Sequence, residues 1–183
     1  MKKLFLSSLF VFNFSLLQAG MIVDFYVGGV ASVGNNIAFS VPAEGNIKKS
    51  ANSFGAVAGV DLPIIRVEGE YGFLTSKTID LHVGMVNGYI KLFPTPIVKP
   101  YIGLGVGRVL GGSVDGGADI NSAMGYQAMA GLQFSIPMTP LFFDIEGRVF
   151  YADDVATVSI PPLAEKDIGF AQYDIRGKIR IAF

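Results

Sequence analysis

The sequence contains no cysteine and only one histidine, and these two shortages exclude several kinds of chemistry. Without cysteine there is no disulfide framework, no thiolate metal site and no cysteine for lipid attachment. With His82 as the only histidine, a metal ion would have to rely on oxygen ligands. Basic residues are not in excess, because 14 lysine and arginine residues stand against 15 aspartate and glutamate residues. The composition therefore predicts no metal, no cofactor and no nucleic-acid partner.

Long apolar runs are also scarce, although the chain is 51% hydrophobic and its mean hydropathy is +0.49. After Gly20 no apolar stretch approaches the length of about 18 residues that marks a spanning helix without a charge, glycine or proline interrupting it. Only helices and closed barrels satisfy all their backbone groups inside a bilayer. The excess apolar surface therefore points to a transmembrane β-barrel.

The first 19 residues have the three-part layout of a secretory signal peptide. Residues 1–3 are positive, residues 4–17 are apolar, and small residues follow, with cleavage expected after Ala19. The apolar part is shorter than the roughly 20 residues that a membrane anchor needs. The sequence thus predicts a signal peptide over residues 1–19, which is removed, and one barrel domain over residues 20–183.

Strict alternation of apolar and polar residues marks three segments, 65–73, 141–151 and 172–183. A period of two places the charged side chains of each segment on one face of a strand. Weaker versions of the pattern cover residues 22–33, 53–62, 79–93, 101–109 and 124–136. We expect the segment 79–93 to change phase near Met85. Together the segments predict an all-β fold, an eight-stranded antiparallel up-and-down β-barrel that crosses a membrane.

The connections between these segments are of two kinds. Short, proline-marked turns lie at 61–63, 94–100 and 137–140, where proline costs no ladder hydrogen bond. Longer polar stretches lie at 34–52, 111–123 and 152–167, and the short link 75–78 falls on their side. This alternation is typical of outer-membrane barrels, with turns in the periplasm and loops outside. Aromatic residues near the strand ends predict interfacial girdles: Phe73, Phe93, Tyr101, Phe142, Phe143, Tyr151, Tyr173 and Phe183.

Charged residues of both signs are expected to point into the barrel. The interior of an eight-stranded barrel is only wide enough for side chains, so these charges should pair and fill the lumen. A selective channel would instead favour a ring of one sign at a constriction. The predicted lumen charge network consists of Asp24, Arg66, Glu68, Glu70, Lys91, Arg108, Asp144, Glu146, Arg148, Asp174, Arg176, Lys178 and Arg180.

Residues 87–107, NGYIKLFPTPIVKPYIGLGVG, resemble the family of small eight-stranded outer-membrane barrels that includes OmpA-like and opacity-type surface proteins. The likeness lies in Asn87 and Tyr89, the turn at 94–100, and Pro100-Tyr101 followed by alternating glycines. The last strand resembles the C-terminal signal that the barrel-assembly machinery recognises, through Tyr173, Ile175, Ile179, Ile181 and Phe183. The resemblance implies export to the bacterial outer membrane, with the assembly machinery and periplasmic chaperones as partners during biogenesis and outer-membrane lipid afterwards.

The expected function is that of a non-enzymatic surface protein with a filled lumen. Its external loops would mediate adhesion, contact with a host or environmental ligand, or envelope integrity, because loops on a rigid scaffold commonly bind. Three alternatives remain open. The first is a small-solute porin. The second is a barrel lipid hydrolase whose activity would depend on His82, with Asp80 on the same face; no nucleophile can be placed from the sequence, although Ser76 and Thr78 are close. The third is a soluble periplasmic lipocalin-like barrel, with its apolar face inside.

Overall fold

The regular structure in the described part of the chain is entirely β-strand. The computed structural model describes residues 23–41, 45–49, 52–76, 79–93, 95, 97–114, 122–158 and 166–183. The predicted signal peptide, 1–19, lies outside these residues. None of the described residues forms a helix long and apolar enough to cross a membrane. The strands are β1 (Asp24–Val41), β2 (Gly45–Lys49), β3 (Asn52–Asp61), β4 (Ile65–Thr75), β5 (Ile79–Lys91), β6 (Val98–Val114), β7 (Met124–Ser135), β8 (Leu141–Val158) and β9 (Lys166–Ala182).

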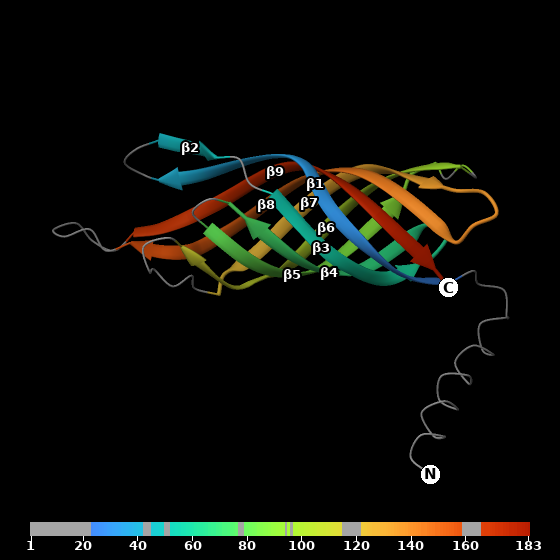
Figure 1. Cartoon of the computed structure of the whole chain (residues 1–183), viewed down its shortest axis with the longest axis horizontal. Helices are drawn as coiled ribbons and strands as arrows, with labels where there is room; N and C mark the ends of the chain where they lie inside the picture. The colour runs from blue at the N-terminus through green and yellow to red at the C-terminus, as the bar shows by residue number, and fades with distance from the viewer. Residues whose placement is uncertain are drawn as a thin grey trace, which may run out of the picture.

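Eight of these strands close into an up-and-down antiparallel barrel. From β3 to β9 each strand pairs with its neighbours in sequence, and β1 pairs with both β3 and β9. Figure 1 shows β1 and β9 side by side along the seam, with the C-terminus at one end of the barrel. We call this the turn end, because the short links β3–β4, β5–β6 and β7–β8 also lie there, and we call the opposite end the loop end. The predicted eight-stranded fold is confirmed.

The strands reach further toward the loop end than the sequence pattern indicated. The stretch 34–52, expected to be a loop, contains the second half of β1 and the short strand β2, which pairs with it. β8 and β9 likewise pair as far as Val158 and Lys166. Backbone hydrogen bonds form a ladder whatever the side chains are, so a strand can extend beyond the segment in which apolar and polar residues alternate. The periodic signal therefore ended before the strands did.

β5 does not change phase, contrary to the prediction. Leu81, Met85 and Tyr89 are all buried on the inward face, so the alternation continues through the strand. The irregularity lies in the partner strand, where His82 pairs with Gly111 and the next residue, Val83, pairs with Val109. The skipped residue is Leu110, and Gly111 has a φ of +151°. This is a β-bulge at a glycine, which absorbs one extra residue of β6.

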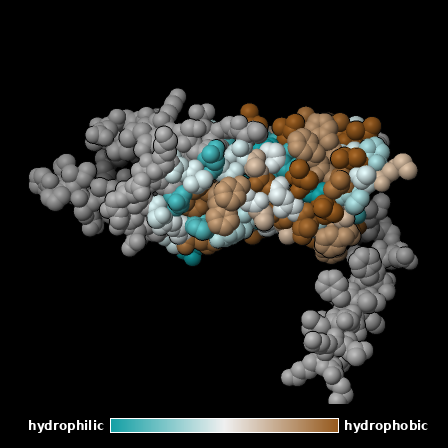
Figure 2. Space-filling model, in the orientation of Figure 1, coloured by the Kyte–Doolittle hydropathy of each residue, from teal (hydrophilic) through white to brown (hydrophobic). Residues whose placement is uncertain are grey.

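The two faces of the barrel wall have opposite polarity. Most outward side chains toward the turn end are apolar, and Leu104 and Val86 are 72% and 60% exposed. Figure 2 shows such side chains gathered over the half of the visible face nearest the turn end. Among the residues whose burial is described, most of the charged side chains point inward, and several of these are fully buried. A soluble lipocalin-like barrel would have the reverse arrangement, so the structure contradicts that alternative.

The predicted aromatic girdle needs two corrections. Tyr101 is 2% exposed and faces the lumen, where it hydrogen-bonds a carboxylate. Phe142 is only partly exposed, and its ring lies 5.4 Å from the guanidinium carbon of Arg180, an inward residue. Every second side chain of each strand points into the lumen, and both residues occupy such positions. Phe143 and Tyr151 point outward as predicted and are 39% and 45% exposed.

Inward glycines make room for the large lumen side chains. A Cβ atom on Gly105 would overlap Asn87 Oδ1 and would come within 2.8 Å of Gln127 Cγ. One on Gly131 would lie 2.7 Å from the Tyr101 ring. Gly88 is different, because a Cβ there would meet nothing within 4 Å. The alternating glycines of β6 therefore leave the space that the large lumen side chains occupy.

We expect Gly105→Val to lower the free energy of unfolding by about 1–3 kcal/mol or more, because an overpacked core must shift its neighbours. Gly88→Val is the matched control, and the added side chain points to the outer surface, so stability should change little. Urea titration of the barrel refolded in detergent micelles measures both. Equal effects of the two substitutions would contradict this account of the glycines.

Candidate functional site: the charged lumen

The lumen holds a balanced set of buried charges. Among the residues whose burial is described, six acidic and six basic side chains are buried. The acids are Asp61, Glu68, Glu70, Asp144, Glu146 and Asp174, and the bases are Arg66, Lys91, Arg148, Arg176, Lys178 and Arg180. Every one of them takes part in at least one ion pair. Burial of so many charges is tolerated only when each has such partners.

The layer nearest the turn end is built around two aspartates. Asp61 forms an ion pair with Lys91, whose Nζ also donates to the Leu62 carbonyl at 2.7 Å. Deeper in the lumen, Asp144 accepts hydrogen bonds from Arg180 Nε and Nη2, both at 2.9 Å. Arg66 Nη1 donates to the same carboxylate at 3.1 Å. One carboxylate thus joins arginines from β4 and β9 across the barrel.

Aromatic rings separate this layer from the next. The guanidinium carbon of Arg66 lies 4.0 Å from the ring centroid of Tyr89 and 4.5 Å from that of Tyr101. The two rings meet edge to face, with their centroids 5.4 Å apart. Cations over aromatic faces are stabilised by the ring quadrupole, more strongly away from water. The rings therefore stabilise Arg66 and fill space at the same time.

Lys178 is at the centre of the middle layer. Its Nζ lies 2.8 Å from Glu68 Oε1 and 3.2 Å from Glu146 Oε2. Tyrosine hydroxyls donate further hydrogen bonds to the same two carboxylates. Tyr26 donates to Glu68 Oε2 at 2.8 Å, and Tyr101 donates to Glu146 Oε2 at 3.0 Å.

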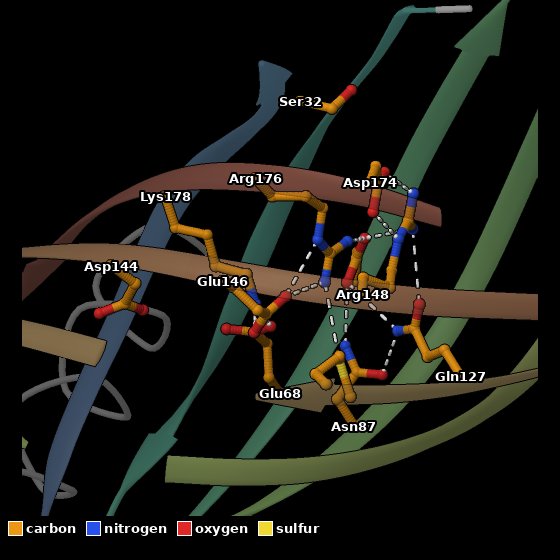
Figure 3. Close-up of polar contacts among 12 residues, drawn as sticks. Ser32, Glu68, Asn87, Gln127, Asp144, Glu146, Arg148, Asp174, Arg176 and Lys178 are labelled. Carbon is orange, nitrogen blue, oxygen red and sulfur yellow. Dashed lines mark hydrogen bonds and ion pairs between the residues drawn. The ribbon is translucent and has the colours of Figure 1, made fainter. Parts of the chain in front are cut away.

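Two arginines organise the layer nearest the loop end (Figure 3). Arg176 forms ion pairs with both Glu70 and Glu146, and so links this layer to the middle one. Arg148 Nε donates to Asp174 Oδ1 at 2.9 Å, and Arg148 Nη1 lies 3.7 Å from Glu70 Oε1. Side-chain amides complete the layer: Asn87 Nδ2 donates to Glu70 Oε2, Gln127 Nε2 donates to Asn87 Oδ1, and Gln172 Nε2 donates to Asp174 Oδ2.

An apolar cluster lies beyond the charges, on the loop-end side of the lumen. This apolar plug consists of Leu74, Leu81, Met85, Val109, Ala123, Phe150 and Ala152, all at most 5% exposed. A cavity of about 20 Å³ lies between the plug and the charged layer, with Glu70, Arg148 and Leu81 in its lining. A water molecule needs about 10–15 Å³ on this measure, so the space suits a single ordered water. In the described part of the lumen, matched charges are therefore followed by an apolar cluster.

Two of the predicted lumen charges do not join the network. Arg108 is exposed on the outer surface, since it shares the outward parity of Leu104 and Val106. Its prediction as a lumen residue was wrong. Asp24 pairs in register with Asp61 and is half-buried at the turn end. No ion pair joins Asp24 to another described residue.

Several lumen residues were missed by the sequence analysis. Asp61 belongs to the network, but it ends its strand in a segment with weak alternation, and it was assigned to a turn. Tyr26 and Tyr101 were not separable from membrane-facing aromatics by type alone. The available signal was their register with neighbouring strands, because a tyrosine opposite an inward charged residue must itself point inward.

The only histidine lies on the outer surface. The Tyr71 hydroxyl is 3.0 Å from His82 Nδ1, and the His82 ring packs edge-on against Phe73 with centroids 4.8 Å apart. Asp80 accepts instead from Thr75 Oγ1 at 2.6 Å. The Asp80–His82 pair that a hydrolase would need is therefore not formed. The described residues also contain no group of three or more potential metal ligands.

The residues of the predicted C-terminal assembly signal share one face of β9. Tyr173, Ile175, Ile179, Ile181 and Phe183 are between 48% and 62% exposed and point away from the lumen. The Phe183 backbone N–H donates to the Phe25 carbonyl at 2.9 Å, which continues the seam between β1 and β9. The position on the outer face is structural fact, whereas recognition by the assembly machinery stays a prediction.

Comparison with solved structures places this architecture among small outer-membrane barrels. The crystal structure of Neisserial surface protein A is similar with a TM-score of 0.63 and 20% identity, over 87% of this chain and 97% of that chain. The N-terminal β-barrel domain of Pseudomonas aeruginosa OprF is similar with a TM-score of 0.51 and 11% identity, over 86% and 97%. No protein-family model and no curated protein sequence matches the chain. At these identities the similarity is one of fold: the chain has the fold of the small eight-stranded outer-membrane barrels.

Proposed function

We propose that this protein is a non-enzymatic β-barrel of the bacterial outer membrane, with a closed lumen and its activity at the loop end. The observation that carries the proposal is the interior, in which six acidic and six basic side chains pair beneath the apolar plug. A pore for ions would need a continuous wet path through these layers. The lumen therefore serves as the rigid core of a scaffold.

The outer face supports a membrane location. Leu104, Ile179 and Val86 are each at least 60% exposed, a pattern that is costly in water when it covers a whole surface. The same surface in lipid tails is the apolar band of a membrane barrel. The apolar band therefore supports export through the predicted signal peptide and insertion into the outer membrane.

The loop end supports the assignment of function. β1, β9 and β8 continue past the barrel wall as a paired sheet, with β2 at its edge. Register pairs extend as far as Ser40 with Gly169. A sheet anchored in a rigid barrel is a scaffold for the connections at this end, and connections on a rigid scaffold are suited to bind an extracellular or host ligand, or to protect the envelope.

Membrane fractionation, a heat-modifiability gel and planar-bilayer recording together test the proposal. We expect the protein in the outer-membrane fraction, with different migration before and after boiling, and without discrete conductance steps. Regular conductance steps would contradict the closed lumen and favour the porin alternative. Recovery in the soluble periplasmic fraction would overturn the membrane location.

The proposed partnership with the barrel-assembly machinery makes a separate prediction. Phe183→Ala should lower the amount of folded protein in the outer membrane several-fold, whereas the purified variant should refold in detergent like the wild type. The substitution leaves the backbone hydrogen bond to Phe25 intact, so little stability is lost. Phe143→Ala removes another outward ring near the turn end and should leave membrane levels nearly unchanged. Normal levels of Phe183→Ala would contradict the assembly role.

A further inference from the structure

The outer wall has an apolar hollow where small residues replace large ones. The hollow has a volume of about 680 Å³ and extends from β1 to β6. Its outward-facing floor consists of Ala56, Ala58, Gly69 and Gly84, with Val86 at its side. Elsewhere on the same strands the outward residues are bulky, as at Phe54 and Ile90.

A second, polar hollow adjoins it toward the loop end. This hollow has a volume of about 520 Å³, and its lining includes Tyr71, Asp80, His82 and Ser113. Tyr71 lines both hollows, and its hydroxyl approaches His82 Nδ1. The bulge in β6 shapes the floor here through Leu110 and Gly111. The two hollows thus form one amphipathic depression, apolar toward the turn end and polar toward the loop end.

An unpaired cation lies beside the junction of the two hollows. Arg108 pairs in register with Gly84, a residue of the apolar hollow, and its side chain is exposed on the outer surface. Among the described residues, none forms an ion pair or hydrogen bond with it. Ile102, Leu104 and Val106 precede it on the same face, so Arg108 follows three exposed apolar residues along β6. Its guanidinium can therefore bind an anionic ligand.

We propose that this depression binds one phosphate-bearing lipid of the outer leaflet. The acyl chain lies over Gly69, Ala58 and Ala56, and the phosphate is bound by the Arg108 guanidinium, which matches phosphate oxygens in a fork geometry. His82 and Tyr71 supply further hydrogen-bonding groups beside it. The carboxylate of Asp80 lies further toward the loop end, where Thr75 holds it. The inference rests on the proposed outer-membrane location.

Charge and shape together select this occupant. A free phosphate would use Arg108 but leave the apolar hollow empty, and a neutral lipid would fill the hollow but leave the guanidinium unpaired. An anionic head group gives the guanidinium a charge-assisted partner, which a neutral head group does not, and this favours the anionic lipid. An anionic lipid satisfies both parts of the depression with one molecule.

The test uses the full barrel folded in zwitterionic detergent, with diphosphorylated lipid A as the probe and native mass spectrometry to count bound lipid. We expect one retained lipid per wild-type barrel and a rise in the midpoint of thermal unfolding on a heat-modifiability gel. Arg108→Gln should weaken binding about tenfold or more, because a charge-assisted contact is lost. Gly69→Leu should also weaken it, since the new side chain occupies the hollow.

The controls match each change. Gly147→Leu adds the same side chain to an outward glycine on β8, across the barrel, where an added Cβ meets a carbonyl oxygen at 3.8 Å as at Gly69. Lys99→Gln removes one positive charge from the other end of β6. Both should bind lipid A like the wild type, and inorganic phosphate alone should not reproduce the stabilisation.

Equal lipid retention by wild type and Arg108→Gln would overturn the proposal, as would equal losses in Gly69→Leu and Gly147→Leu. Stabilisation by inorganic phosphate alone would overturn the lipid as occupant. Each variant must first show the heat-modifiable shift of a folded barrel, and all binding is measured in detergent. If a folded barrel fails to bind lipid A, the lipid site is ruled out but the proposed scaffold function is not. Conductance steps or recovery in the soluble fraction would instead count against the scaffold function.

Discussion

Arg176→Met should lower the free energy of unfolding of the barrel by about 3–5 kcal/mol, the cost typical of breaking a buried ion pair by removing one partner. Arg176 is 1% exposed and joins Glu70 to Glu146 across two layers of the lumen. Methionine keeps much of the side-chain volume but leaves both carboxylates with one cation fewer. Urea titration in detergent micelles, followed by the shift on an unboiled gel, measures the loss.

Arg108→Met is the matched control, because it makes the same change in an exposed arginine outside the network. In zwitterionic detergent its unfolding free energy should stay within about 0.5 kcal/mol of wild type. The double variant Arg176→Met/Glu70→Gln should recover part of the loss, since it removes one of the stranded negative charges. A loss in Arg176→Met no larger than that in Arg108→Met would show that the lumen pairs contribute little to stability.

Leu104→Arg should destabilise the barrel by about 2–4 kcal/mol in phospholipid vesicles, the cost of a cation at the bilayer midplane on the outer face of a barrel. Leu104 is 72% exposed and lies midway along the apolar face of β6. In a water-soluble protein the same change at so exposed a position would be nearly neutral. The experiment therefore measures what surrounds the barrel, and not how it is packed.

Ile64→Arg supplies the comparison at the edge of the band. Ile64 is 61% exposed but lies in the turn between β3 and β4, where a cation should cost only about 0–1 kcal/mol because it reaches the interface. Folding equilibria in vesicles, measured by urea titration, give both values. Equal, small effects of Leu104→Arg and Ile64→Arg would contradict a hydrocarbon environment around β6.

The amino-acid sequence alone was enough to determine the barrel and the polarity of its wall. In segments such as 65–73, Arg66, Glu68 and Glu70 alternate so regularly with apolar residues that only a strand explains them. Strand parity then decides which side chains share a face, and this is why most of the predicted lumen charges do lie in the lumen. Proline at the turns likewise indicated which ends of the strands lie together.

Tertiary structure decided the features that depend on neighbouring strands: the orientation of single side chains, the bulge and the ion-pair partners. Tyr101 and Arg108 lie on one strand and face opposite ways, yet their residue types suggested the reverse. The bulge at Leu110 and the pairing of β1 with β9 are set by register between strands distant in the sequence. Which acid meets which base, and whether a cation is left on the lipid face, follows from that register. Alternation specifies the face of a side chain, and only the closed barrel specifies its partner.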